Sequence, residues 1–146
     1  MRSPDLDAYD AVLIGLWLSM LVVQSLADNA KYAYKQIPVD ERPTPWIQSG
    51  LWALSRHPNY AAEIIMWWIL ATVAARGIEA PGMFWTAQLA PTFTTLLLYC
   101  LTGPMLERKQ AEEYGTDARY LAYYRRTPYI LPLVPCPVDP FATKKQ

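Results

Sequence analysis

The sequence is poor in charge, and it contains only two cysteines and one histidine. Charged residues are 18% of the 146 residues, against about one quarter in soluble domains. Cys100 lies in an apolar run and Cys136 in a proline-rich tail, so no disulfide framework is indicated. The net charge of zero gives no footprint for nucleic acid, and no metal site is expected.

The main feature of the sequence is its long uncharged runs. Residues 11–27 and 80–106 carry no charge, and each reaches the length of a membrane-spanning helix, about 17–25 residues. A third run, 64–75, reaches that length only if its helix begins near Pro58 and includes Glu63. The sequence therefore predicts an all-α integral membrane bundle, a single domain over 1–146, with three transmembrane helices at about 10–28, 58–77 and 82–104 and a cytoplasmic tail at 105–146.

The basic residues predict an orientation. If all three segments span, 11 of the 13 Lys and Arg residues lie on one side with the first loop and the tail, and only Arg2 and Arg76 lie on the other. The positive-inside rule makes the first side cytoplasmic, and a bacterial inner membrane is the expected location. A soluble helical bundle with an aromatic core is the alternative, but such a bundle has no reason to sort its charges in this way.

Helix start and stop signals divide the rest of the chain. One helix is predicted over about 104–114, stopped by Gly115. Another is predicted to start after Thr116 or Asp117, either of which can cap it, and to end before Pro128. Both are expected to be short interfacial helices. Pro91 predicts a kink in the last span.

Three polar groups lie on the predicted cytoplasmic side. Gln24, Asp28, Lys31 and Lys35 share one helix face, because they are spaced three or four residues apart. The lysines suit phosphate, and a solvated helix end with snorkelling lysines is the alternative.

In the tail, tyrosines beside arginines can stack on a nucleotide or lie at a membrane interface. The tail group is Glu107, Arg119, Tyr120, Tyr123, Tyr124, Arg125 and Arg126.

The densest polar group is the segment 55–63, with the sequence SRHPNYAAE. Its proline suits the first position of a helix. Arg56 and His57 then stand just before a helix N-terminus, where free N–H groups favour an anion. Glu63 lies about one turn inside the predicted span, where a carboxylate is costly and indicates function. The alternatives are that Glu63 stays at headgroup depth and that His57 only caps the helix.

A resemblance to a known superfamily rests on residues 50–68, GLWALSRHPNYAAEIIMWW. This stretch resembles bacterial membrane proteins of unknown function that are grouped with the C-terminal domain of the steroid 5-alpha-reductases. Two weaker matches lie on either side of this stretch, in the order that the superfamily has them. They are LADNAKYAYK at 26–35 and GPMLERKQAEEYGTDARYLAYYRRTPYILPLVP at 103–135. The resemblance covers nearly the whole chain after Ala8.

The resemblance implies a helical membrane fold that holds NADPH in a cytoplasm-facing cavity. The implied reaction is hydride transfer to an activated C=C bond of a lipid or steroid-like enone, so membrane lipids and a lipophilic small molecule are the expected partners. Glu63 and Tyr60 are the catalytic candidates. Carried over residue by residue, the cofactor contacts are Gln24, Asp28, Lys35, Arg56, His57, Asn59, Tyr60, Glu63, Tyr120 and Tyr124.

Other interpretations stay open. The reductases have further helices upstream that polarise the substrate carbonyl, so a missing N-terminal half, a partner chain or a homo-oligomer is expected to complete the site. Small membrane methyltransferases of the isoprenylcysteine carboxyl methyltransferase type share an R-H-P-x-Y-x-G-E pattern and bind S-adenosylmethionine. Ala62 stands where they have glycine, and Asn59 with the Trp67–Trp68 pair favours the reductases. A non-catalytic membrane subunit is the remaining interpretation.

Overall fold

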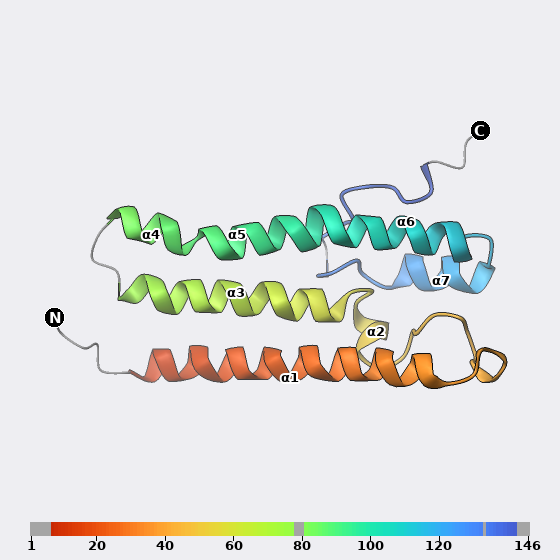
Figure 1. The fold of residues 1–146 in the computed structure, drawn as a ribbon, viewed down its shortest axis with the longest axis horizontal. Coiled ribbons are helices and arrows are strands. Elements are labelled where there is room, and N and C mark those ends of the chain that lie inside the picture. The colour runs from red at the N-terminus through yellow and green to blue at the C-terminus, as the bar shows by residue number, and fades with distance from the viewer. Residues whose placement is uncertain (1–6, 78–80, 133, 143–146) are drawn as a thin grey trace.

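The computed structural model describes residues 7–77, 81–132 and 134–142, and within these ranges the regular structure is helical with no strand. Three rods lie side by side (Figure 1). The first is α1 (Ala8–Gln36), and the second, which packs against both of the others, is α3 (Pro58–Arg76). The third is built from α4 (Pro81–Ala87), α5 (Leu89–Thr95), the π-helix η2 (Leu96–Thr102) and α6 (Gly103–Tyr114). The predicted all-α class is confirmed for these residues.

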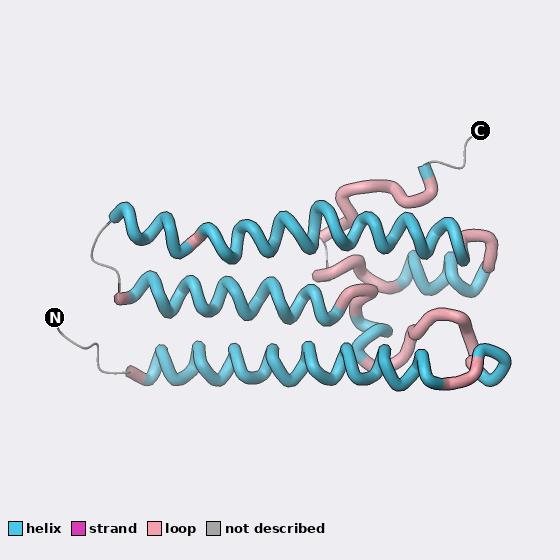
Figure 2. The backbone as a smooth tube through the Cα atoms, viewed as in Figure 1, coloured by secondary structure: helices cyan, strands magenta, loops and turns pink. Residues whose placement is uncertain are grey.

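The short elements gather at one end of the rods, together with most of the loops (Figure 2). They are η1 (Val39–Glu41), α2 (Leu51–Leu54) and α7 (Ala118–Arg126). Two predicted helix boundaries are confirmed: Pro58 is the first residue of α3, and Gly115 ends α6. Asp117 caps α7, because its side chain accepts a hydrogen bond from the backbone N–H of Arg119 at 2.8 Å. This end of the bundle is called the loop end below.

Two helices are long and apolar enough to cross a membrane. They are α1, with a mean hydropathy of 1.8, and the 33-residue helix 82–114, with a mean hydropathy of 1.3. Large apolar side chains such as Leu18 and Phe93 are exposed on them. A kink was expected in the second of these helices, and the helix is interrupted at Gln88. The reason is that Pro91 cannot donate a backbone hydrogen bond to the preceding turn. Length and composition thus support two spans among the described residues, and α3, with 19 residues, stays a predicted third.

The third rod contains a π-helix into which a tail residue is inserted. The N–H of Gly103 donates to the carbonyl of Leu98, five residues back, so Pro104, which has no N–H, leaves the carbonyl of Tyr99 without its backbone donor. The Tyr129 hydroxyl donates to that carbonyl at 3.0 Å. Glycine at 103 leaves room for this contact, because a Cβ there would lie 1.9 Å from the Tyr129 hydroxyl oxygen and would displace it. The helix expected over about 104–114 is present as α6, and it continues the third rod directly. Its interfacial position stays a prediction.

The basic residues are divided unevenly between the two ends of the bundle. Away from the loop end, Arg76 forms ion pairs with Asp7 and with Asp10, the latter at 3.0 Å between Nε and Oδ1. The other nine of the ten basic residues that the structure describes lie toward the loop end (Figure 1). The fold therefore places the positive charge at one end of three antiparallel rods.

Candidate functional site

A buried carboxylate joins α6 to the start of α3. Glu107, on α6, is fully buried. One of its oxygens lies 2.9 Å from Nη2 of Arg56, and the other lies 2.8 Å from Nε2 of His57. Arg56 also donates from Nε to both oxygens at 3.1 Å. Arg56 and His57 are only 6% and 2% exposed, so charge-assisted hydrogen bonds replace the hydration that the carboxylate has lost.

The remaining donors of Arg56 bind the tail. Nη1 donates to the carbonyl oxygen of Tyr124 at 2.8 Å and to that of Thr127 at 2.5 Å. The backbone N–H of Arg56 donates to the carbonyl of Pro128 at 2.9 Å. Arg56 therefore ties α6, α7 and the tail to the start of α3, and its donors point mainly at protein acceptors. The phosphate contact expected of Arg56 stays a prediction.

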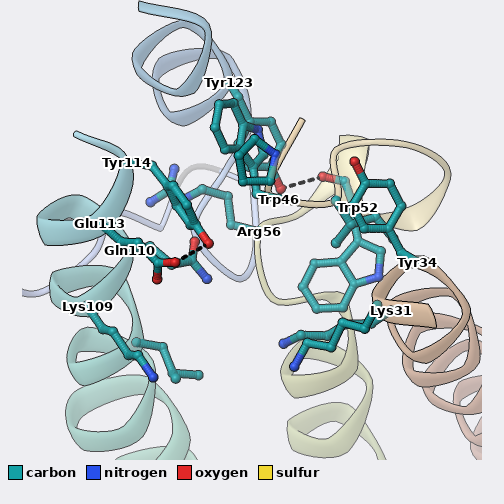
Figure 3. Close-up of a pocket in the computed structure, with 14 residues that line it drawn as sticks. Lys31, Tyr34, Trp46, Trp52, Arg56, Lys109, Gln110, Glu113, Tyr114 and Tyr123 are labelled. Atoms are coloured by element: carbon teal, nitrogen blue, oxygen red, sulfur yellow. Dashed lines mark hydrogen bonds between the residues drawn. The ribbon is translucent and has the colours of Figure 1, made fainter. Parts of the chain in front are cut away.

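A cavity of about 190 Å³ opens beside this network, between α1, α6 and the loop before α2 (Figure 3). We call it the loop-end cavity. Its cationic groups other than Arg56 are Lys31 and Lys35 from α1 and Lys109 from α6, and Figure 3 shows Lys31 and Lys109 extending toward the gap between the two helices. Its one acidic lining residue, Glu113, accepts a hydrogen bond from Tyr114 at 2.6 Å. The cavity therefore carries excess positive charge, which suits an anionic ligand.

Aromatic rings form other walls of the loop-end cavity. Trp46 and Trp52 are 6% and 3% exposed. Trp52 is fixed by a hydrogen bond from Nε1 to the carbonyl of Ala27 at 3.1 Å, and the ammonium of Lys31 lies 4.8 Å from the centre of its ring. Nε1 of Trp46 is buried and has no partner among the described residues. Flat rings beside ammonium groups suit a planar base that carries phosphate.

A second space, of about 280 Å³, lies between α1, α3 and the third rod, and we call it the interhelical pocket. Glu63 organises its polar side, since its two oxygens accept from Nε2 of Gln24 at 2.5 Å and from Nε1 of Trp67 at 3.0 Å. Asn59 donates to Asp28 at 2.9 Å, and its own Oδ1 is buried with no partner in the described part of the chain. The pocket thus presents carboxylate and amide groups beside apolar walls. The remaining lining residues are Tyr60, Thr94, Leu97 and Leu98.

Comparison with known proteins gives one match. The family described as "Protein of unknown function (DUF1295)" matches residues 1–127. The chain belongs to the DUF1295 family. No curated protein and no solved structure gave a match. The link to the steroid 5-alpha-reductases therefore stays a prediction.

In this DUF1295 chain the predicted site residues divide between the two spaces. The interhelical pocket is lined by Gln24, Asn59, Tyr60 and Glu63, with Asp28 bonded at its edge. The loop-end cavity is lined by Lys35 and Arg56. His57 connects the two sets, because it shares Glu107 with Arg56 and its ring stacks on Tyr60 with 5.3 Å between the ring centres.

The two tail tyrosines lie outside both spaces. Tyr120 is fully buried and packs edge-on against Trp46, with 5.2 Å between the ring centres, so it supports a cavity wall without lining it. Tyr124 lies under the guanidinium of Arg56, 4.0 Å from it. Burial raises the pKa of Tyr124 to about 12, so its phenol is neutral at physiological pH. The cofactor contacts expected of both tyrosines stay predictions.

Sequence reasoning placed Glu107 in the polar tail group without giving it a role, and it did not identify Lys109 or Trp46 as site residues. Glu107 left one usable signal, since it is the first charge after the uncharged run 80–106 and so stands where burial is most costly without a partner. Nothing local identifies Lys109 or Trp46. They reach the loop-end cavity only because α6 extends past the start of α3 and the loop before α2 folds back beside it.

Proposed function

We propose that this chain is a membrane-embedded, NADPH-binding oxidoreductase that reduces the activated C=C bond of a lipid or steroid-like enone. One observation supports the proposal most. A cationic, aromatic cavity and a polar pocket between helices both use α1, which contributes Lys31 and Lys35 to the first and Gln24 to the second. The remaining arguments concern length, charge and chemistry.

The length of the α1 face suits an extended dinucleotide. Gln24 and Lys35 are 11 residues apart, which is about 16 Å along a helix that rises about 1.5 Å per residue. A dinucleotide carries phosphates and adenine at one end and nicotinamide at the other. The lysines would receive the phosphates, and Trp46 and Trp52 offer flat surfaces for the adenine. Side-chain amides and the Glu63 carboxylate in the interhelical pocket offer donors and acceptors for the carboxamide of the nicotinamide.

The charge of the loop-end cavity favours NADPH over S-adenosylmethionine. Lys31, Lys35 and Lys109 face a space whose one acidic lining residue is Glu113. Excess positive charge attracts phosphates, whereas S-adenosylmethionine carries a sulfonium cation and no phosphate. A methyltransferase therefore gains no support from this cavity, and binding of S-adenosylmethionine is kept as an outcome of the test.

The proposed chemistry needs a hydride and a proton. When bound, NADPH supplies a hydride to the carbon β to the substrate carbonyl. The carbon α to the carbonyl then needs a proton, and Tyr60, whose side chain lines the interhelical pocket, is the candidate donor. Glu63 would act as an orienting group, because both of its oxygens are already engaged by Gln24 and Trp67.

The proposed topology has three spans with the loop end in the cytoplasm. The 19 residues of α3 give a length of about 28 Å, close to the hydrocarbon thickness of about 30 Å. The charge difference between the two ends supports this orientation. NADPH would then reach the loop-end cavity directly from the cytoplasm.

The test is ligand binding by the purified chain in detergent. NADPH is expected to raise the thermal stability and to quench tryptophan fluorescence by energy transfer, because Trp46 and Trp52 line the cavity. Lys109→Ala is expected to weaken NADPH binding at least about fivefold, consistent with loss of roughly 1 kcal/mol from one charge-assisted contact. The matched control is Arg108→Ala on the same helix, which removes an exposed cation that does not line the cavity.

Two outcomes would contradict the proposal. Stabilisation by S-adenosylmethionine without any effect of NADPH would assign the chain to the methyltransferases. Equal loss of NADPH affinity in Lys109→Ala and Arg108→Ala would show that binding depends on overall charge and not on the loop-end cavity.

A further inference from the structure

The imidazole ring of His57 is held by one hydrogen bond and by two neighbouring aromatic rings. Its Nε2 lies 2.8 Å from Oε1 of Glu107. Its ring stacks nearly parallel to Tyr60, at 14°, and stands nearly perpendicular to Tyr129, at 82°, with 5.3 Å between ring centres in each case. An ionised carboxylate can only accept, so the bond to Glu107 requires that Nε2 carries the proton. Glu107 thereby selects both the orientation of the ring and its protonated nitrogen.

Tyr60 links His57 to the interhelical pocket. Its side chain lines the pocket, and its hydroxyl has no hydrogen-bond partner within the described part of the chain. The plane of the Tyr60 ring is therefore fixed by packing, on the buried cluster of Ile64, Tyr129 and Ile130 and on the stacked ring of His57. A phenol that must meet one substrate atom needs such support, because a displacement of about 1 Å is enough to impair a reaction strongly.

We infer that Glu107 is a positioning residue, which fixes His57 in its Nε2–H form and, through the stacked ring of His57, holds Tyr60 at the wall of the interhelical pocket. The role of Tyr60 in this inference rests on the proposed function. Glu107 also pairs with Arg56, so it joins the support of the interhelical pocket to a residue that lines the loop-end cavity.

The first test needs no cofactor. His57 is the only histidine, so ¹⁵N-histidine labelling gives a single pair of ring signals. We expect the wild-type spectrum to show a proton on Nε2. In Glu107→Gln the amide oxygen is expected to face the Arg56 cation, which turns the amide NH₂ toward His57 and transfers the ring proton to Nδ1. Glu112→Gln, an exposed change on the same helix, is the control and should leave the spectrum unchanged.

The second test separates positioning from folding. NADPH binding is compared with binding of adenosine 2′,5′-bisphosphate, which has the adenosine and phosphate groups but no nicotinamide. Both Glu107→Gln and His57→Ala are expected to weaken NADPH binding about tenfold, as loss of a supporting partner commonly does, while bisphosphate binding changes less than about twofold. His57→Ala leaves the Arg56–Glu107 pair intact. This variant therefore tests the positioning of Tyr60 even if Glu107→Gln does not fold.

The outcomes distinguish this inference from the proposed function. If the wild-type chain binds neither ligand, the proposed function fails, and the histidine spectrum still tests the role of Glu107. An unprotonated Nε2 in the wild-type chain, or a spectrum that Glu107→Gln does not change, would overturn the positioning role. Equal weakening of both ligands in His57→Ala would also overturn it, since that result describes general structural damage.

Discussion

Gly103→Ala is expected to lower the free energy of unfolding by about 1–3 kcal/mol. The added Cβ would lie 1.9 Å from the Tyr129 hydroxyl oxygen and 2.8 Å from the carbonyl oxygen of Leu98. Relieving this overlap costs about 1–3 kcal/mol for a packed interior. Displacing Tyr129 also loses its bond to the carbonyl of Tyr99, about 1 kcal/mol. The greater helix propensity of alanine offsets about 1 kcal/mol of this loss of stability.

Gly15→Ala is the matched control for this substitution. Gly15 lies within α1, and a Cβ there would meet no atom within 4 Å. The same chemical change should therefore leave stability unchanged or raise it by up to about 1 kcal/mol. The assay is unfolding in mixed detergent micelles with increasing sodium dodecyl sulfate, followed by circular dichroism. If the two variants were equally stable, the insertion of Tyr129 over the π-helix would not be an important contact.

Two other substitutions test the buried network and the topology. Arg56→Met leaves the Glu107 charge buried without its main partner and is expected to cost about 3–5 kcal/mol in the same unfolding assay, whereas Arg56→Met with Glu107→Leu should cost clearly less. Equal losses in the single and double variants would show that the ion pair is not coupled. In a cysteine-free background, a reagent confined to the outer face should label Gly77→Cys and miss Gln48→Cys, and the opposite pattern would reverse the proposed orientation.

Local sequence signals predicted the helices well. The proline at 58, the glycine at 115 and the aspartate at 117 act within one turn of the boundary that each sets, so their positions alone were sufficient. The signal at Pro104 correctly predicted a helix, but for a tertiary reason it did not show that this helix continues the one before it. A proline normally ends a helix because it removes a hydrogen bond, but here a tyrosine from the tail, 25 positions later, restores the bond.

The site was only partly predictable. Spacing placed Gln24 on a face of the first helix and Asn59 with Glu63 on a face of another. The structure brings these two sets into one pocket. Arg56 was recognised as important, but the partners of its side chain were not. Its acceptors are Glu107 and carbonyls of the tail, more than 50 residues away, and the sequence around Arg56 does not indicate which of them it meets.

The sequence by itself determined the all-helical class and the helix boundaries at Pro58, Gly115 and Asp117, because these depend on residues within a few turns of one another. The sorting of the basic residues also followed from the sequence, once the helices were taken to alternate in direction. The tertiary structure alone decided which groups are free to meet a ligand. Packing of α6 and the tail against the start of α3 binds Arg56 and His57 to Glu107, and it leaves three lysines facing the loop-end cavity. A buried charge must find partners wherever the fold supplies them, and spacing along the chain does not specify which side chains those are.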